Sequence, residues 1–252
     1  MILDQIINLK KREVLYKKNK VKINKAKLKK SDRDFRSSIL KKSFTEVNLI
    51  AEIKNKSPSA GKLRQRYEPL RMARVYDKLA NAVSVVTEEE FFGGSLDDLE
   101  KVRKATKLPI LRKDFILDEY QIYESRKYGA DAVLLIASLL SKNKINSLIT
   151  LADKYCMDAI VEVHTKRELM EVLQTNAQII GINNRNLRTM KINLNTTSRL
   201  APLIPKNRVI VSESGISSKK DVDEVRDHVD AILVGTSLLK AKDVAKKIAE
   251  FK

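Results

Sequence analysis

The sequence predicts a (β/α)8 barrel, the TIM-barrel architecture, preceded by an N-terminal helical extension. After residue 47, eight short apolar runs rich in β-branched residues alternate with helical patterns. Alternating strands and helices form parallel sheets with right-handed crossovers, and about 200 residues are enough for eight such units to close into a barrel. We expect one domain, with the extension over residues 1–46 and the barrel over residues 47–252.

The expected strands are continuously apolar rather than alternating, which is typical of strands that are covered on both faces. They are expected at residues 48–54, 83–88, 109–114, 132–138, 158–163, 179–184, 209–214 and 231–236. An open doubly wound sheet is the alternative architecture, but no GxGxxG pattern follows the first run to support it.

Helical patterns separate the strands, and several open with a residue that can cap a helix. Ser95 precedes Asp97, and Thr165 precedes Glu168, at a spacing that suits helix caps. Apolar residues three and four apart also predict a helix over residues 3–18 of the extension. The helices between and after the strands are expected at residues 69–80, 95–106, 119–130, 144–156, 166–174, 218–228 and 240–251.

Positive charge is concentrated near the N-terminus. The formal net charge is +18, and residues 1–42 hold 15 Lys or Arg against 4 Asp or Glu, a net charge of +11. Nucleic-acid binding through this basic arm is one interpretation. Because the arm lacks interleaved aromatic residues and any RNA-recognition pattern, we favour an anionic small-molecule substrate and expect no nucleic-acid partner.

The remaining composition argues against several other classes of protein. No apolar run approaches the roughly 20 residues that span a bilayer, and the N-terminus lacks a secretory-signal pattern. The single cysteine, Cys156, cannot form an internal disulfide, and with two histidines it makes no metal-ligand cluster. We expect a cytoplasmic monomer without membrane, metal or cofactor, and we expect Cys156 to be buried at a helix end.

Polar residues gather at the C-terminal ends of the expected strands, where barrel enzymes carry their active sites. Side chains two residues apart in a strand share a face, so Glu52 and Lys54 point the same way into the barrel mouth. The other strand-end residues that extend an inward apolar row are Lys113, Glu162, Asn183 and Glu213. An ion-pair network that merely closes the barrel is the alternative, but several converging charges favour a catalytic site.

Small residues after the last two expected strands indicate a phosphate site. Ser214-Gly215 and Gly235-Thr236 supply backbone N–H groups at the usual phosphate position of such barrels. Thr236 and Ser237 are also expected to cap a following short helix, whose N-terminus would attract an anion.

At these positions the sequence resembles the indole-3-glycerol phosphate synthase family. The segments that carry the resemblance are IAEIKNKSPSAG (50–61), TEEEFFGGS (87–95), PILRKDF (109–115), VEVH (161–164), GINNRNL (181–187), VSESGI (211–216) and LVGTSL (233–238). They occur in the family's order across the whole barrel, and the N-terminal helical segment is similar to a family feature. Thr236 departs from the family, where serine is common, and so do Gly93 and Gly94.

The resemblance implies a carboxy-lyase of tryptophan biosynthesis that needs no cofactor. Its substrate would be 1-(2-carboxyphenylamino)-1-deoxyribulose 5-phosphate, which undergoes ring closure, decarboxylation and dehydration to indole-3-glycerol phosphate. Closing the ring needs an acid at the ribulose carbonyl, and we expect Lys113, with a depressed pKa, to be that acid. Glu162 is the expected base or relay in the loss of water.

The resemblance also implies roles for the other residues of the pocket. Glu52, Asn183 and Glu213 would orient the lysines and the sugar hydroxyls. Lys54 has three open roles: it pairs with the carboxylate that leaves as CO2, pairs with the phosphate, or acts as an alternate acid. The remaining substrate contacts are expected from Ser57, Phe92, Phe115, Leu134, Arg185 and Ser214, and phosphate contacts from Lys54, Gly215, Gly235 and Thr236.

Two residue-level expectations concern the edges of the site. Ser57 begins a polar loop, with Pro58 and Ser59 next to it, that ends near Glu68 and is expected to close as a lid. His164 lies just beyond the fifth expected strand, and we expect it to be a bystander rather than a catalyst.

Other phosphate-handling barrel enzymes are the alternatives. A phosphoribosylanthranilate isomerase would need a cysteine and an aspartate at strand ends, and no expected strand ends in cysteine. A Schiff-base aldolase would need a desolvated lysine with no carboxylate beside it.

Overall fold

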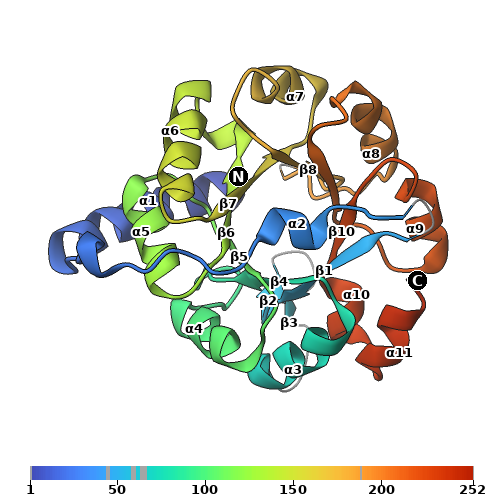
Figure 1. The fold of residues 1–252 in the computed structure, drawn as a ribbon, viewed down its shortest axis with the longest axis horizontal. Helices are drawn as coiled ribbons and strands as arrows, with labels where there is room; N and C mark the ends of the chain where they lie inside the picture. The colour runs from blue at the N-terminus through green and yellow to red at the C-terminus, as the bar shows by residue number, and fades with distance from the viewer. Residues whose placement is uncertain (1, 44–45, 58–60, 63–66, 188, 252) are drawn as a thin grey trace.

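A computed structural model describes residues 2–43, 46–57, 61–62, 67–187 and 189–251. Eight parallel strands hydrogen-bond in the closed order β1-β10-β9-β8-β7-β6-β5-β4, which confirms the predicted barrel (Figure 1). These strands are β1 (Asn48–Ile53), β4 (Ala82–Val86), β5 (Ile110–Lys113), β6 (Ala132–Ile136), β7 (Asp158–Val163), β8 (Ile179–Asn183), β9 (Val209–Glu213) and β10 (Ala231–Val234).

Helices surround the ring of strands (Figure 1). They are α3 (Pro69–Leu79), α4 (Leu96–Ala105), α5 (Glu119–Lys127), α6 (Lys142–Asp153), α7 (Lys166–Val172), α8 (Asn195–Leu200), α9 (Lys219–Val225), α10 (Thr236–Lys240) and α11 (Val244–Ala249). The sequence missed α8, which buries Thr197 and Leu200 and is too short for a clear apolar period. The last helix begins at Val244 rather than residue 240 because Asp243 caps it, accepting the N–H of Lys246.

The interior of the barrel is divided between an apolar part and a charged part. Leu111, Ile160 and Val211 are fully buried and belong to one interior cluster. Each lies two residues before a charged side chain at the C-terminal end of its strand, as the period of two requires. The strands therefore fill the barrel with aliphatic packing and present charge at one mouth.

The N-terminal mouth is closed by α2 (Phe35–Ile39), a short helix of the extension. Phe35 and Ile39 are fully buried in the same interior cluster as the strands. The backbone N–H of Arg36 donates to Asp158 Oδ2 at 2.9 Å, and that of Lys41 donates to Asp230 Oδ1 at 3.2 Å. Figure 1 shows α2 lying across the centre of the ring of strands, so it plugs the end opposite the charged mouth.

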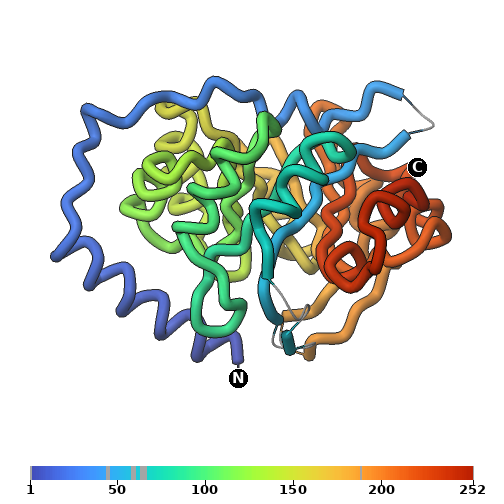
Figure 2. The backbone as a smooth tube through the Cα atoms, turned by 90° about the horizontal axis from the view of Figure 1, so that it is seen from below, coloured from blue at the N-terminus to red at the C-terminus, as the bar shows by residue number. Residues whose placement is uncertain are grey.

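The first helix, α1 (Ile2–Lys20), follows the side of the barrel to the other end (Figure 2). Its Lys10 is 2% exposed, and Lys10 Nζ lies 3.1 Å from Asp114 Oδ1, just after β5. Asp114 Oδ2 also lies 2.9 Å from Arg112 Nη2. The extension therefore contacts the barrel at both ends, with an apolar plug at one and a buried ion pair at the other.

Cys156 corrects one prediction from composition. It is exposed, with φ 54°, in the turn that closes α6, so the prediction that it is buried was wrong. The left-handed conformation turns the chain toward β7, and this directs the side chain to solvent.

Within the described part of the chain, no helix has the length and apolar character needed to cross a membrane.

If α2 is an integral part of the core, Phe35→Ala will lower the free energy of unfolding by about 3–5 kcal/mol, because it opens a cavity in a fully buried site. Leu15→Ala on α1 is the control, since Leu15 is 62% exposed, and its effect should stay within about 0.5 kcal/mol. Urea unfolding followed by circular dichroism measures both variants. Equal stabilities for the two would contradict the plug.

Candidate active site

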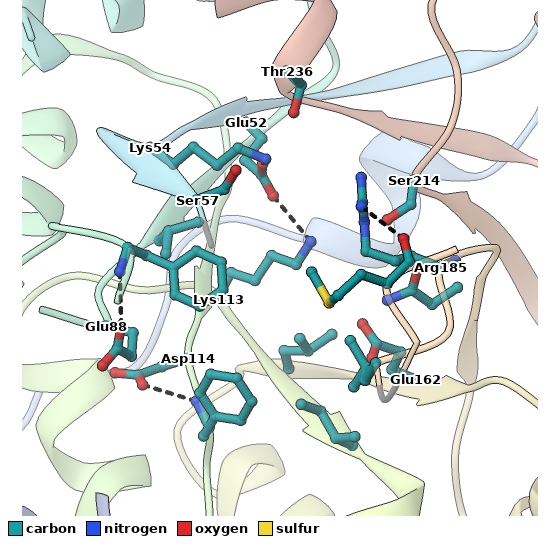
Figure 3. Close-up of a pocket in the computed structure, with 18 residues that line it drawn as sticks. Glu52, Lys54, Ser57, Glu88, Lys113, Asp114, Glu162, Arg185, Ser214 and Thr236 are labelled. Atoms are coloured by element: carbon teal, nitrogen blue, oxygen red, sulfur yellow. Dashed lines mark hydrogen bonds and ion pairs between the residues drawn. The ribbon is translucent and has the colours of Figure 1, made fainter. Parts of the chain in front are cut away.

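A cavity opens at the C-terminal mouth of the barrel (Figure 3). Its empty volume is about 770 Å³, which includes the space open to solvent and suits a small-molecule ligand. The predicted residues that line it are Glu52, Lys54, Ser57, Phe92, Lys113, Phe115, Leu134, Glu162, Asn183, Arg185, Ser214 and Thr236. Residues from strands far apart in the sequence therefore meet in one place.

Glu52 joins the two lysines of the cavity. Its Oε1 lies 2.6 Å from Lys54 Nζ, and its Oε2 accepts a hydrogen bond of 2.9 Å from Lys113 Nζ. Burial opposes the charge on Glu52, but Lys113 and Lys54 outweigh it and lower the pKa of Glu52 to about 2. Glu52 is therefore ionised at neutral pH and holds both ammonium groups on the mouth of the barrel.

Lys113 is surrounded by carboxylates rather than by positive charge. Besides Glu52, Glu213 Oε2 lies 3.4 Å from Lys113 Nζ, and Glu162 adds a further negative charge nearby. Burial would lower the pKa of Lys113, but these carboxylates raise it. The prediction of a depressed pKa was wrong, because three acidic neighbours, Glu52, Glu213 and Glu162, outweigh the effect of burial.

Glu213 is a carboxylate whose pKa is raised by burial. It is fully buried, and burial raises its pKa to about 7, with Glu162 and Glu52 adding to the rise and Lys113 opposing it. A Cβ at Gly181 on the neighbouring strand would collide with Glu213 Oε1. Gly181 therefore leaves room for this side chain beside Lys113.

Glu162 and Asn183 form the opposite side of the cavity. His164 Nε2 lies 3.3 Å from Glu162 Oε1. Burial raises the pKa of Glu162, but His164 first and then Lys113 and Asn183 lower it overall. Asn183 Oδ1 also accepts the backbone N–H of Arg185 at 2.9 Å, which fixes the start of the following loop. His164, predicted to be a bystander, thus contacts the candidate base.

Aromatic and aliphatic side chains make an apolar wall. The rings of Phe92 and Phe115 lie 6.4 Å apart at 45°, and Leu134 lines the same cavity. Glu88 holds the loop that carries Phe92, because Glu88 Oε2 accepts the N–H groups of Phe91 and Phe92 at 2.8 and 2.9 Å. This arrangement offers a flat apolar surface to an aromatic ring.

Six lining residues were not predicted from the sequence: Val86, Glu88, Asp114, Ile136, Leu187 and Met190. The two-residue period of a strand could have predicted Ile136, since it lies two positions after Leu134 on β6 and shares its face. Leu187 and Met190 lie in the loop after β8, where no periodic pattern indicates direction.

The predicted phosphate residues occupy the turns after β9 and β10. Ser214 and Gly215 both have positive φ, 67° and 92°, which makes a sharp turn at the end of β9. Thr236 lines the cavity and is the first residue of α10. The prediction that Thr236 and Ser237 cap this helix was wrong, because Gly235 is the N-cap and the Ser237 hydroxyl donates to the carbonyl of Ile216 instead. Gly215 and Gly235 do not line the cavity, and a Cβ at Gly235 would collide with Glu52 Oε1. Gly235 therefore also makes room for the Glu52 carboxylate.

Ser57 is buried at the edge of the cavity, and its Oγ has no hydrogen-bond partner among the described residues. Ser57 belongs to β2 (Lys56–Ser57), which pairs antiparallel with β3 (Gly61–Lys62). The predicted lid extends over residues 58–60 and 63–66, which lie outside the described residues.

Converging lysines and glutamates at the C-terminal mouth of a (β/α)8 barrel lie where the enzymes of this fold carry their active sites. The sequence matches the profile of the family described as indole-3-glycerol phosphate synthase over residues 3–251. The chain belongs to the indole-3-glycerol phosphate synthase family, which confirms the predicted family and its activity class.

Relatives with the same name match over most of their length. The indole-3-glycerol phosphate synthase of Dehalococcoides mccartyi strain CBDB1 is 50% identical over 210 residues, which cover 81% of each chain. That of Acetivibrio thermocellus is 43% identical over 260 aligned positions, covering 100% of this chain and 99% of the relative. That of Thermoanaerobacter sp. strain X514 is 42% identical, covering 100% and 97%.

The raised pKa of Glu213 gives a pH-dependent stability. Below the unfolded pKa of 4.5 the group is protonated in both states, and between 4.5 and about 7 only the folded state keeps the proton. Folded stability therefore falls as pH rises through this window, by an amount on the order of 3 kcal/mol. Glu213→Gln removes this loss, so its free energy of unfolding should exceed that of the wild type at pH 8.

Urea unfolding at pH 5 and pH 8 tests this, with Glu171→Gln, at an exposed site on α7, as the control. The difference between Glu213→Gln and the wild type should grow from pH 5 to pH 8, while that of the control stays constant. A difference independent of pH would show that Glu213 is ionised throughout the window.

Proposed function

We propose that this chain converts 1-(2-carboxyphenylamino)-1-deoxyribulose 5-phosphate into indole-3-glycerol phosphate in tryptophan biosynthesis, using Lys113 as the acid. The observation that carries the proposal is Lys113 itself, held among carboxylates in a cavity with an apolar wall on one side. An ammonium group fixed in this way is positioned to donate a proton where negative charge develops on a substrate oxygen.

The two ends of the cavity suit the two ends of this substrate. The carboxyphenyl ring would lie against Phe92, Phe115 and Leu134. The phosphate would lie toward Thr236 and Lys54, because the first N–H groups of a helix lack partners inside the helix and attract anions. We also assign the turn at Ser214-Gly215, Gly235 and Ser57 to the contacts with substrate and phosphate. Ser57 Oγ has no hydrogen-bond partner among the described residues.

Ring closure forms a bond between the ring carbon that carries the carboxylate and the ribulose carbonyl carbon. Lys113 donates a proton to the carbonyl oxygen as this bond forms, and Glu52 and Glu213 stabilise the ammonium group before transfer. Loss of CO2 then returns an electron pair to the ring. Arg185, whose backbone is anchored to Asn183, is assigned to the departing carboxylate as an anion clamp.

Dehydration needs one proton delivered to the leaving hydroxyl and one removed from the new five-membered ring. Glu162 lies across the cavity from Lys54 and is assigned to removing the proton, because its lowered pKa keeps it ionised. Asn183 lies beside Glu162 and is assigned to orienting it and the sugar hydroxyls.

The environment of Lys113 argues against a Schiff-base aldolase. Such an enzyme needs a neutral amine, whereas Glu52 and Glu213 lie within 3.4 Å of the Lys113 ammonium group and raise its pKa. Borohydride added with substrate should therefore leave Lys113 unmodified.

We also propose that the chain works as a one-domain cytoplasmic monomer that binds no nucleic acid. The proposal rests on the one closed barrel that the described strands form, on membership of a biosynthetic enzyme family, and on the lack of interleaved aromatics in the basic arm. A gel shift by the full chain at physiological salt would contradict the last point.

The decisive assay follows indole fluorescence as the purified chain meets the carboxyphenylamino substrate, and fluorescence should rise with turnover. Lys113→Ala should lower kcat by about 10²–10⁴-fold with KM nearly unchanged, because the lysine acts in the transition state. Lys104→Ala is the control, since Lys104 is exposed on α4. No product from the wild type would refute the activity, and normal turnover by Lys113→Ala would refute the acid.

A further inference from the structure

His164 is wedged between two carboxylates at the edge of the active site. Its Nε2 lies 3.3 Å from Glu162 Oε1, and its Nδ1 lies 3.4 Å from Glu168 Oε2. The side chain is 11% exposed. Glu162 and His164 are two residues apart at the end of β7, so both side chains leave the chain on the same side.

Helix α7 holds this arrangement from behind. The backbone N–H of His164 donates to Glu168 Oε2 at 2.6 Å, and Thr165 Oγ1 caps the helix by accepting the N–H of Glu168 at 3.2 Å. Glu168 therefore binds both the backbone and the ring of His164. The ring is fixed by the same contacts that start the helix.

The two carboxylates beside the His164 ring favour its protonated form, the imidazolium. A neutral imidazole has one N–H and one lone pair, so one ring nitrogen would present a lone pair to a carboxylate. An imidazolium has N–H groups on both nitrogens and a positive charge that attracts both carboxylates, at ion-pair distances of 3.3 and 3.4 Å. His164 Nε2 and Glu162 Oε1 are both buried and have no hydrogen-bond partner among the described residues, so their contact is an ion pair. Burial lowers the pKa of His164, but Glu162 and Glu168 outweigh it and raise the pKa to about 10.

We propose that His164 is a positioning residue for the reaction, an imidazolium that holds the Glu162 carboxylate ionised and oriented toward the substrate. Glu168 acts through His164, since it fixes the ring and balances its charge. This inference rests on the proposed role of Glu162 as the base. It replaces the prediction that His164 is a bystander.

Other charged groups near this pair come from three more elements. Lys113 on β5 lowers the pKa of Glu162, whereas Glu213 on β9 carries a like charge nearby. Asp4 and Lys11 on α1 line a second cleft that includes His164 and Glu168. These two have opposite charges, so the two glutamates that contact the ring dominate its protonation.

The protonation state can be read directly, because the chain contains two histidines, His164 and His228. In protein labelled with ¹⁵N-histidine, His228→Gln assigns the remaining signals to His164. Both ring nitrogens of His164 should give imidazolium shifts from pH 6 to pH 8. A neutral ring at pH 7 would overturn the proposal, whatever the activity of the enzyme.

Kinetics test the effect on Glu162. His164→Gln should move the acid limb of the kcat/KM profile to higher pH by about one unit, so its loss of activity should grow as pH falls through this limb, toward about tenfold well below both pKa values, and should be smallest at pH 8. Glu168→Gln should shift the limb in the same direction by less. An equal loss at every pH would mean that His164 has a structural role alone.

A double-mutant cycle separates this inference from the proposed function. In a Glu162→Gln background, His164→Gln should lower kcat/KM little further, because residue 162 no longer carries the charge on which His164 acts. Fully additive losses would overturn the coupling. Wild-type turnover measured in the same series shows whether the activity itself holds, and the spectra remain decisive where His164→Gln fails to fold.

Discussion

The bridge that Glu52 makes between Lys54 and Lys113 is the interaction on which the active site depends. One carboxylate lies 2.6 and 2.9 Å from two ammonium groups in a mouth where Glu52 itself is 2% exposed. Breaking a buried ion pair by removing one partner typically costs about 3–5 kcal/mol, because the remaining charge stays buried. Here two cations would be left behind, and the position of both would be lost together.

The rest of the barrel accommodates this charged cluster. Gly235 and Gly181 have no side chain where Glu52 and Glu213 need space, so each carboxylate reaches across to Lys113. Aliphatic packing fills the barrel below, and α2 seals the far end, so the charges gather at one mouth. The outward side chains of β5 join a second ion-pair group that reaches α1, which fixes the strand from outside.

Much of this could be predicted from the sequence, because strands have a strict period of two. Glu52 and Lys54 were placed on one face in this way, and the strand ends marked the mouth of the barrel. The direction of the Lys113 pKa shift was predicted wrongly, because the balance between burial and the carboxylates of Glu52, Glu213 and Glu162 depends on distances that are set only when the sheet closes. For the same reason, the need for a glycine at Gly181 and Gly235 could not be predicted, because the carboxylates that require the space lie on other strands. The contact of His164 with Glu168 could not be predicted either, because it depends on how α7 leaves the strand.

The plug has a consequence for the order in which the chain acquires its structure. The N–H of Lys41 donates to Asp230, a residue 189 positions later, and β1 pairs with β10 over Asn48–Ala51. The segment that leaves the ribosome first therefore cannot complete its contacts until the final strand has been synthesised. Contacts of such long sequence separation fold slowly, so the nascent N-terminal helices must wait with Phe35 and Ile39 unburied.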